Sequence, residues 1–480
     1  MRGKRPIGAI KRALDTVFRT EEDLEMLTGS IGKPLFFLSL PLVLTNLLQS
    51  AYNIADTFWL GQYGTNELAA ISFAWPPLFL LMMLGMGVAV AGSVLVAQYT
   101  GAGKERTAEY SAAQTITFAV LASVVIGSIG YLMAGPLIGV LGAAPEVHPL
   151  ATGYLQVVSI GYVFMFGFMV FNSVMRGYGD TVTPMLVMAA TVVLNIVLDP
   201  FPIFGWGPFP ELGILGAAYA TIFSRAVGLA IGMYVMLYSS RGITIHLRDT
   251  IPDLAFFRRI VRIGAPAAVE GVSRAVSQNL LMIVVGWFAT PIVAGFGIAT
   301  RVFSIVFTLG VAVDRGVETM SGQNLGAEKP DRAGSAARIA AIGLFVFLSG
   351  IGAVLFVGAV PISALFTPDQ AVIDASAEFM RWVAPTLGFI GLMRAYSGSL
   401  RGAGKTLTVA AIAVLMMGVT RFPLAWIAAS IMGETGIWLA FGASNVVGGL
   451  VAYLWYQRGT WRNVDLTEQE PDLPVEEVPE

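Results

Sequence analysis

The sequence predicts an all-α polytopic membrane protein, with twelve transmembrane helices in two pseudo-symmetric lobes of six helices each. Three observations support this fold class: the composition, a series of long apolar segments, and an internal repeat. Of the 480 residues, 56% are hydrophobic and only 12% are charged, and the mean hydropathy is +0.73. Soluble proteins carry about 25% charged residues, so the composition excludes an ordinary soluble domain. The net charge of −2 gives no reason to expect nucleic-acid binding.

Twelve apolar segments follow residue 33, and each is long enough to cross a bilayer. They span residues 34–61, 68–97, 111–133, 151–175, 183–203, 213–239, 264–288, 294–321, 339–359, 377–399, 407–431 and 436–456. Every second connection, starting with the first, contains no Lys or Arg, whereas the alternate connections contain basic residues such as Lys104, Arg176 and Arg401. The positive-inside rule therefore predicts that the basic loops and both termini face the cytoplasm.

The second half of the chain repeats the first at an offset of 225 residues. The matching features are Pro41 and Pro266, residues 98–104 and 323–329, and residues 176–181 and 401–406. Each repeat has six crossings, so both insert in the same orientation. We expect a pseudo-twofold axis along the membrane normal, with a central cavity between the lobes.

These patterns divide the chain into five predicted regions. They are a cytoplasmic N-terminal segment (1–33), an N-terminal six-helix lobe (34–239), a cytoplasmic inter-lobe linker (240–262), a C-terminal six-helix lobe (263–460), and an acidic, disordered tail (461–480). Residues 7–27 form either an amphipathic helix on the membrane surface or a solvated tail.

Polar residues form a stripe toward the end of the first apolar segment. They fall three or four residues apart, so they lie on one face of a helix. It comprises Thr45, Gln49, Tyr52, Asn53 and Asp56. Placing a charged side chain in the middle of a membrane costs about 2.5–3.5 kcal/mol on insertion scales, so an acid there indicates a functional site.

A second intramembrane acid, Asp199, lies one helical turn after Asn195, near the outer end of segment 5. Asp56 is at a similar depth in the same lobe, which predicts a shared proton or cation site. Burial and mutual repulsion would allow at least one carboxylate to bind a proton, and the same oxygens suit sodium. The simpler alternative is that Asp199 is a helix-end acid exposed to water.

The second repeat lacks these two acids. Leu281 is the equivalent of Asp56, and segment 11 carries Arg421 in the region where segment 5 carries Asp199, so ion coupling is predicted in the N-terminal lobe alone. Five other charged residues within segments are interpreted as ion pairs in preference to substrate contacts: Glu270, Arg274, Asp314, Arg315 and Glu318. Five further arginines could pair, reach the membrane interface or line the cavity: Arg225, Arg301, Arg381, Arg394 and Arg421.

An ordered set of motifs carries a family resemblance. They are residues 56–61, the loop with Gln98, Gly101 and Gly103, the turn at 176–180, Asn195 with Asp199-Pro200, and residues 213–221. Together with the repeat, they resemble the multidrug and toxic compound extrusion (MATE) family, in its DinF-like branch, over residues 34–460.

The resemblance implies a MATE/MOP-type fold and a secondary active multidrug efflux antiporter. Such a protein exchanges cationic or amphipathic compounds for H+ or Na+ by alternating access. The implied coupling site comprises Asp56, Asn195, Asp199 and Thr221, with Asp56 and Asp199 as metal ligands if the ion is sodium. The implied substrate cavity comprises Gln49, Tyr52, Asn172 and Met188, and Pro41 is the implied helix-bending residue.

The chain is accordingly expected to need no cofactor beyond the coupling ion, and not to be an enzyme. We expect a monomer in the inner (cytoplasmic) membrane that acts on small-molecule drugs or toxic metabolites. The closest alternative is a lipid-linked oligosaccharide flippase of the same superfamily, a class that tends to have cationic cavities. The alternative from another class is an intramembrane enzyme such as a prenyltransferase or a protease, which would need paired catalytic motifs that the sequence does not show. Residues 177–180 have the letters of an intramembrane aspartyl protease motif. Lys405 stands where the repeat would place the equivalent of Asp180, which favours a structural turn.

Overall fold

A computed structural model describes residues 26–239, 242–463, 466–467 and 471. Ten of the described helices are long and apolar enough to cross a membrane, or up to eleven if the bent pair α5 (His148–Ile160) and α6 (Tyr162–Tyr178) is one span. The remaining predicted segment, 377–399, falls on α14 (Gln370–Val383) and α15 (Leu387–Gly402). A 3-10 turn at Pro385 separates these helices. With 14 and 16 residues, neither is long enough alone to span a bilayer.

The contacts divide the helices into two compact units. Unit 1 contains Leu40–Ala268, and unit 2 contains Met26–Ser39 and Val269–Leu466. Besides α5 and α6, the elements of unit 1 are α3 (Thr65–Gly101), α4 (Glu105–Val140), α7 (Val182–Leu198), α8 (Pro200–Phe204), α9 (Ile214–Tyr238), η2 (Leu247–Thr250), most of α2 (Gly32–Tyr63) and the start of α10 (Leu254–Val285). Besides α14 and α15, those of unit 2 are the rest of α10, α11 (Thr290–Gly326), α12 (Pro330–Val357), α13 (Ala359–Ala364), η3 (Ala384–Thr386), α16 (Thr406–Ala413), the π-helix η4 (Val414–Arg421), α17 (Phe422–Met432) and α18 (Glu434–Gln457).

The helices recur at the predicted offset. Both the first and the last residues of α3 and α11 are 225 positions apart. The close contacts recur as well, because Gly177 of α6 packs against the backbone of Ser93, and Gly402 of α15 packs in the same way against Glu318. A side chain at either glycine would collide with that backbone, so the small residue is what lets the two helices approach.

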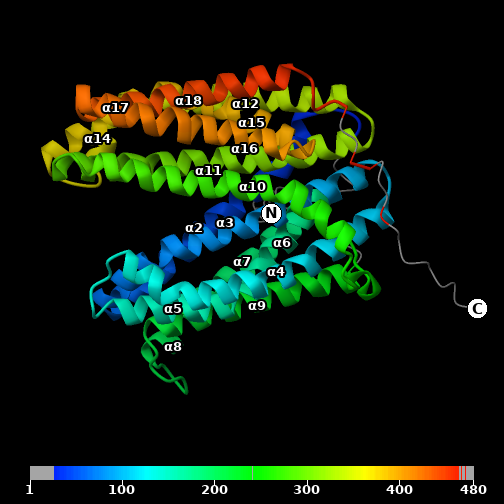
Figure 1. Cartoon of the computed structure of the whole chain (residues 1–480), viewed down its shortest axis with the longest axis horizontal. Helices are drawn as coiled ribbons and strands as arrows, with labels where there is room; N and C mark the ends of the chain where they lie inside the picture. The colour runs from blue at the N-terminus through cyan, green and yellow to red at the C-terminus, as the bar shows by residue number, and fades with distance from the viewer. Residues whose placement is uncertain (1–25, 240–241, 464–465, 468–470, 472–480) are drawn as a thin grey trace, which may run out of the picture. The chain divides into compact units, whose positions relative to one another are not determined.

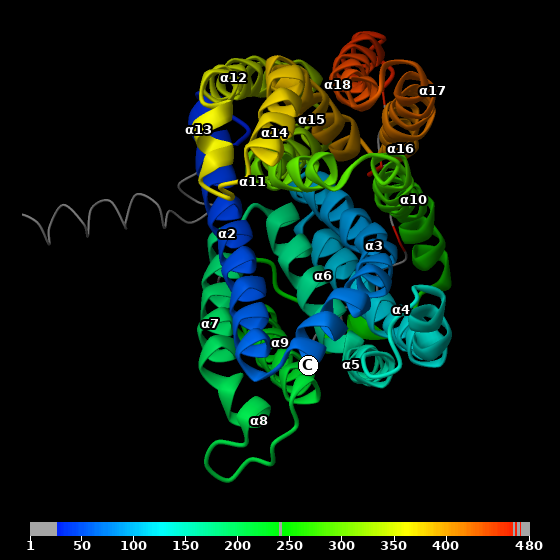
Figure 2. The ribbon, with the colours of Figure 1, turned by 90° about the vertical axis from the view of Figure 1, so that its left-hand side faces the viewer.

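In unit 1, α3 packs against α4 and α6, and α6 packs against α9 (Figure 1). The α5–α6 pair bends by 55° at Gly161. A Cβ atom at Gly161 would collide with the side chain of Ile222, so the bend lies at a point of close packing against α9. Figure 2 shows the short helix α8 at the end of α7.

In unit 2, α15 is the central helix and packs against α11, α12 and α18 (Figure 1). Aromatic rings fill the core, and Phe379 contacts Phe296, Phe303, Trp438 and Phe441 with ring centroids 4.5–5.8 Å apart. Such pairs add stability beyond the area they bury.

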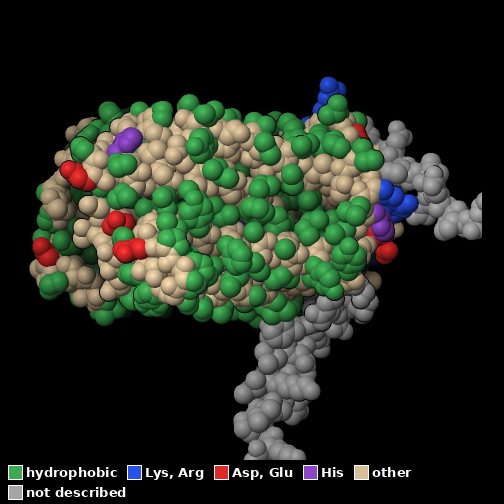
Figure 3. Space-filling model, turned by 90° about the horizontal axis from the view of Figure 1, so that it is seen from below, with side chains coloured by type: hydrophobic (Ala, Val, Ile, Leu, Met, Phe, Trp, Pro, Cys, Tyr) green, Lys and Arg blue, Asp and Glu red, His purple; other side chains and the backbone are tan. Residues whose placement is uncertain are grey.

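Large apolar side chains are exposed on the outside of many helices, including Val124, Val193, Val346 and Leu454. Figure 3 shows one face on which the middle is largely apolar, whereas the Lys, Arg, Asp and Glu side chains lie near its two ends. This distribution fits contact with the hydrocarbon layer of a membrane, with charges kept at the polar interfaces.

The structure revises the predicted linker. The described residues 242–268 group with unit 1, and α10 begins at Leu254, ahead of the segment predicted from 264. Gln114 of α4 donates to the carbonyls of Asp249 and Ile251, each at 2.7 Å, and Arg106 donates to the Asp249 carboxylate. The connection between the lobes is therefore a packed element.

The chain ends are also partly packed. Arg332 donates to the carbonyl of Met26 at 3.0 Å, so the end of the predicted N-terminal segment is held against unit 2. Residues 1–25, which hold most of the predicted surface helix, lie outside the described residues. Trp461 is buried and stacks on Tyr456 at 4.7 Å, so the predicted disordered tail cannot begin at residue 461.

Candidate functional site

Two carboxyl groups meet inside unit 1. Asp56 of α2 is 6% exposed, and Asp199, at the junction of α7 and α8, is 0% exposed. The two carboxyl groups are within hydrogen-bonding reach of each other. Pro200 opens α8 and cannot donate a backbone hydrogen bond, which fixes the helix break beside Asp199. The alternative of a water-exposed helix end at Asp199 is therefore wrong.

Asn195 belongs to the same cluster, as its spacing predicts. Its Nδ2 donates to Oδ1 of Asp199 at 2.9 Å. Within the described part of the chain, Oδ1 of Asp56, Oδ2 of Asp199 and Oδ1 of Asn195 are buried and receive no hydrogen bond. Buried acceptors are normally satisfied, so three unsatisfied oxygens in one cluster mark a place where a proton or a cation can bind.

Thr221 of α9 is the fourth residue of the implied coupling site. Its hydroxyl accepts a hydrogen bond from the hydroxyl of Tyr52 at 2.8 Å, and both side chains are buried. Tyr154 of α5, which the sequence analysis did not single out, interacts electrostatically with both Asp56 and Asp199.

Arg225 joins the predicted coupling residues to the predicted cavity residues. Its guanidinium donates to Oε1 of Gln49 at 2.8 Å and to the sulfur of Met188 at 3.3 Å, and it lies 4.6 Å from the ring centroid of Tyr52. Three of the four predicted cavity residues thus surround one buried cation, whose role the sequence left open. Its electrostatic field reaches Asp56.

The fourth predicted cavity residue, Asn172, donates to the carbonyl of Phe168 in its own helix at 2.6 Å. Its Oδ1 is buried and has no hydrogen-bond donor within the described ranges. The contacts recorded for Asn172 therefore do not join it to the cluster around Arg225.

Pro41 and its repeat equivalent Pro266 both lie inside long helices. The boundary between the two units falls within two residues of each proline, after Ser39 in α2 and after Ala268 in α10. Proline removes one helical hydrogen bond and crowds the preceding turn. Each helix is thus locally weakened where it changes from one unit to the other.

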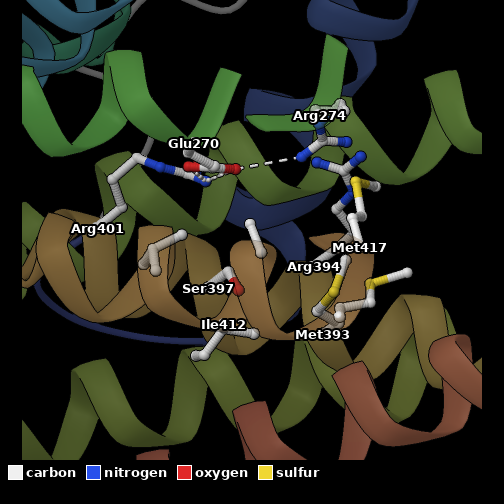
Figure 4. Close-up of a pocket in the computed structure, with 11 residues that line it drawn as sticks. Glu270, Arg274, Met393, Arg394, Ser397, Arg401, Ile412 and Met417 are labelled. Carbon is white, nitrogen blue, oxygen red and sulfur yellow. Dashed lines mark hydrogen bonds and ion pairs between the residues drawn. The ribbon is translucent and has the colours of Figure 1, made fainter. Parts of the chain in front are cut away.

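Unit 2 contains a buried network of charges centred on Arg401 (Figure 4). The Arg401 guanidinium contacts Asp314 at 2.9 Å, Glu270 at 3.2 Å and Glu318 at 3.3 Å, and its side chain is 2% exposed. The sequence analysis counted Arg401 among the loop cations, whereas it lies at the end of α15 and points into the unit. Each of the five residues interpreted as ion-paired, Glu270, Arg274, Asp314, Arg315 and Glu318, has an ion pair, so that interpretation is confirmed.

Three further arginines surround the same carboxylates. Arg315 contacts Glu318 at 2.7 Å, Arg274 contacts Glu270 at 3.2 Å, and Arg394 contacts Asp314 at 3.5 Å. Among the residues that the structure describes, the three carboxylates are thus contacted by four arginines, Arg401 included.

A pocket opens beside this network, between α10, α15, α16 and η4. Its solvent-accessible cavity volume is about 10 Å³, which is room for about one water molecule. Its polar lining includes Arg274, Arg394 and Ser397, and its apolar lining includes Met393 and Met417 (Figure 4).

The motif that resembles a protease site is a structural turn. The Oδ1 atom of Asp180 accepts hydrogen bonds from the backbone N–H groups of Val182 at 3.0 Å and Thr183 at 2.9 Å, which begin α7. The carboxylate thus satisfies backbone donors at the start of a helix. A protease would need the same carboxylate for catalysis, whereas here it holds the turn together.

The chain was compared with known proteins. The MatE family model matches residues 41–201 and again 266–427, which reproduces the repeat. The FAD transporter of Shewanella oneidensis is 29% identical over 435 residues, which cover 90% of this chain and 96% of the relative. The probable multidrug resistance protein NorM of Thermotoga maritima is 28% identical over 404 residues, which cover 83% of this chain and 85% of that relative.

Solved structures have the same fold. The Vibrio cholerae MATE transporter VcmN in the bent form is 26% identical, with a TM-score of 0.83 over 89% of this chain and 96% of that one. A MATE protein in the bent conformation is 24% identical, with a TM-score of 0.85 over 92% of this chain and 98% of that one. The two-part family match, the relatives along nearly the whole chain and the shared fold lead to one conclusion: this chain belongs to the MATE family, and it is a multi-pass membrane transporter and not an enzyme.

Proposed function

We propose that this protein is a secondary active efflux antiporter that exports cationic or amphipathic compounds in exchange for protons. The observation that carries the proposal is the pair of buried carboxyl groups of Asp56 and Asp199, within hydrogen-bonding reach of each other. Two carboxyl groups so close, and away from water, are stable when they share one proton and repel each other when both are ionised.

The pair can couple ion entry to substrate exit by charge. With one shared proton, the pair carries a single negative charge, which the nearby cation of Arg225 balances. Loss of that proton leaves an excess negative charge that a cationic substrate can neutralise. Proton and substrate would therefore be bound alternately, which is what obligatory exchange requires.

Sodium is the second candidate ion, and a specific observation favours it. The oxygens of Asp56, Asp199 and Asn195 that receive no hydrogen bond are hard ligands of the kind sodium prefers. We place the proton first because two carboxyl groups within hydrogen-bonding reach of each other can share one.

Relatives with similar sequences are named for multidrug resistance and, in one case, for FAD transport. These names favour export of soluble compounds over the flippase alternative. We further propose a monomer in the cytoplasmic membrane, with both termini in the cytoplasm, from the segregation of Lys and Arg among the loops.

The test is transport of a fluorescent cation, such as ethidium, by the purified protein in liposomes. A proton gradient and a sodium gradient are applied separately. We expect export on the proton gradient and its loss in Asp56→Asn and in Asp199→Asn. The matched control is Asp331→Asn, an exposed acid at the start of α12 that contacts Arg462.

Each of the other outcomes has a distinct meaning. Transport on the sodium gradient alone would replace the proton with sodium at the same site. Proton-driven transport by both aspartate variants at the wild-type rate would overturn the coupling role of the pair. Absence of transport on both gradients would favour the flippase alternative.

A further inference from the structure

We propose that a cluster of aromatic rings at the end of α2 holds Asp56 in place against Asp199, and that the ring-bearing residues of α2 are positioning residues for this pair. The cluster, here named the aromatic cap, comprises Trp59 and Tyr63 of α2, Phe204 of α8 and Trp206 of the loop after α8. All four belong to unit 1. The inference deepens the proposed function, since it rests on the aspartate pair being the coupling site and assigns a role to residues outside that pair.

The first step concerns the face of α2 that carries the coupling residues. Trp59 follows Asp56 by three residues, and Tyr63 follows Trp59 by four, so the three side chains share one face of the helix. Tyr52, which bonds to Thr221, precedes Asp56 by four residues on the same face. The coupling face of α2 therefore continues into the aromatic cap, about two helical turns beyond Asp56.

The second step concerns the segment on which the cap packs. The backbone N–H of Leu212 donates to the carbonyl of Pro202 at 2.9 Å, and that of Gly213 donates to the carbonyl of Ile203 at 3.2 Å. A side chain at Gly216, in the first turn of α9, would collide with the carbonyl of Pro202. Helix α8 and the start of α9 are thus bonded and packed to each other, and they form one closed segment.

This closed segment positions two residues of the coupling site. Asp199 directly precedes α8, and Thr221 lies about two turns into α9. Asp56 comes instead from α2. The place of α2 against the closed segment therefore sets the distance between the carboxyl groups of Asp56 and Asp199.

The aromatic cap is a direct contact between α2 and the closed segment. The Trp59 ring meets the rings of Phe204 and Trp206 edge to face, with centroids 6.2 and 6.4 Å away. The centroid of the Tyr63 ring lies 5.7 Å from that of Phe204, and a Cβ atom at Gly213 would come within 2.9 Å of the Tyr63 ring. Aromatic pairs at such distances contribute stability beyond the area that they bury.

The core beneath the cap joins the same three helices. Leu60 of α2, Ile203 of α8 and Ile214 of α9 are almost completely buried and belong to one apolar cluster. The cap lies over this cluster and is partly open, since Trp206 is 51% exposed. Replacing a ring of the cap leaves the core residues in place, so its effect on the aspartate pair can be separated from an effect on folding.

Release of bound ethidium by the coupling ion tests the inference. Binding of ethidium to the full-length protein in nanodiscs is measured by fluorescence, without any ion gradient. Protons, and then sodium at a fixed alkaline pH, are titrated until half of the ethidium is released. We expect Trp59→Leu and Tyr63→Leu each to raise the half-releasing concentration of the coupling ion by about two- to tenfold, as the loss of aromatic pairs predicts.

A conservative variant and a matched control accompany these two variants. Tyr63→Phe keeps the ring and loses only an exposed hydrogen bond to Glu211 at 3.0 Å, so it should restore most of the wild-type value. Aromatic side chains also anchor helices at membrane interfaces, and Trp287→Leu controls for that role. Trp287 of unit 2 contacts Trp426 with centroids 4.6 Å apart, and the two are 47% and 46% exposed.

The half-releasing concentration reports on the aspartate pair and not on the amount of folded protein. Partial loss of folding therefore does not mimic the expected result, and melting temperatures are measured in parallel. Among the described residues, the other charged or titratable groups that interact with the two aspartates are Tyr52, Tyr154 and Arg225. None of them is replaced in these variants.

The outcomes separate this inference from the proposed function. Wild-type values in both leucine variants would overturn the positioning role, and so would an equal change in Trp287→Leu. Asp56→Asn tests the coupling site itself and should abolish release by the coupling ion. If Asp56→Asn releases ethidium as the wild type does, the proposed function fails and this inference fails with it. If Asp56→Asn abolishes release and the leucine variants behave as the wild type, only this inference fails.

Discussion

Arg401 donates to the carboxylate of Asp314 across 2.9 Å, and both side chains are almost completely excluded from solvent. Glu270 and Glu318 contact the same guanidinium, so one cation compensates three buried anions. Removing one partner of a buried ion pair costs more than the pair itself contributes, because the remaining charges lose their compensation.

We therefore expect Arg401→Met to lower the stability of the protein by about 3–5 kcal/mol. The measurement is thermal or denaturant unfolding of the purified protein in detergent. Arg462→Met is the control, since the Arg462–Asp331 pair is 46% and 89% exposed and should contribute no more than about 1 kcal/mol. Similar effects of the two substitutions would contradict the central role of Arg401.

The approach of α15 to α11 gives a second prediction. A Cβ atom at Gly402 would collide with the carbonyl of Glu318 and lie 3.0 Å from the backbone nitrogen of Gly322. Since backbone atoms cannot move aside, we expect Gly402→Ala to lower stability by about 1–3 kcal/mol.

Gly343→Ala is the matched control for this substitution. Gly343 lies within α12 of the same unit, and nothing is within 4 Å of the position of its Cβ. Alanine there should be neutral or stabilise the helix by about 0.5–1 kcal/mol. The changes in the free energy of unfolding that the two substitutions cause should therefore differ in sign or clearly in size. A Gly402→Ala variant as stable as the wild type would argue against the close packing.

Much of the fold could be predicted because its signals are periodic or repeated along the chain. The apolar segments, the offset of 225 residues and the family of the chain all followed from the sequence and are confirmed by the helices and by the two-part family match. Assignment to the DinF-like branch stays a prediction. The segment at 377–399 was the hardest case, because a turn at Pro385 divides it into two short helices.

The site could be predicted where its contacts are local. Asn195 and Asp199 are one turn apart, so their hydrogen bond followed from spacing. Arg401 was assigned to a loop because its partners Asp314 and Glu270 are 87 and 131 residues away along the chain. Counting the Lys and Arg residues in the loops cannot show whether a cation at a helix end points into solvent or into the protein.

The pocket of unit 2 was missed for a different reason. The acids of unit 1 do not recur at the offset of 225, so the repeat does not point to a second site by its charges. Applying the same offset to Gln49 leads to Arg274, and applying it to Asn172 leads to Ser397. The repeat thus predicts the location of these pocket residues, although the residue types differ between the two units.

The hydrogen bond from Asn195 to Asp199 gives a third prediction. In Asn195→Ala the carboxyl group loses a donor at 2.9 Å and the buried pair loses part of its polar surroundings. Because a hydrogen bond to a charged group contributes about 1.5–3 kcal/mol, we expect proton-driven export to fall by about tenfold or more. Transport is measured in liposomes at several values of external pH.

The pH profile separates a role in coupling from a role in folding. A coupling residue should shift the pH at which transport is half-maximal, whereas a loss of folded protein lowers transport equally at every pH. Asn279→Ala is the control, since its amide nitrogen donates to the carbonyl of Ala275 in its own helix at 2.9 Å and the residue belongs to neither predicted site. An unchanged pH profile in Asn195→Ala would remove Asn195 from the coupling site.

The hydrogen bond between Tyr52 and Thr221 gives the last prediction, and it distinguishes the two candidate ions. Tyr52→Phe and Thr221→Val each remove the same 2.8 Å hydrogen bond, but only the second also removes the threonine oxygen. If a proton is carried by the two aspartates, that oxygen is not a ligand, and the two variants should lose transport to a similar extent. A neutral hydrogen bond contributes about 0.5–1.5 kcal/mol, so the expected loss is about two- to tenfold in each. If sodium is the ion and the Thr221 hydroxyl coordinates it, Thr221→Val should raise the sodium concentration needed for half-maximal transport, while Tyr52→Phe leaves it unchanged. Measuring both variants on both gradients therefore tests whether the oxygens of this cluster hold a proton or a metal ion.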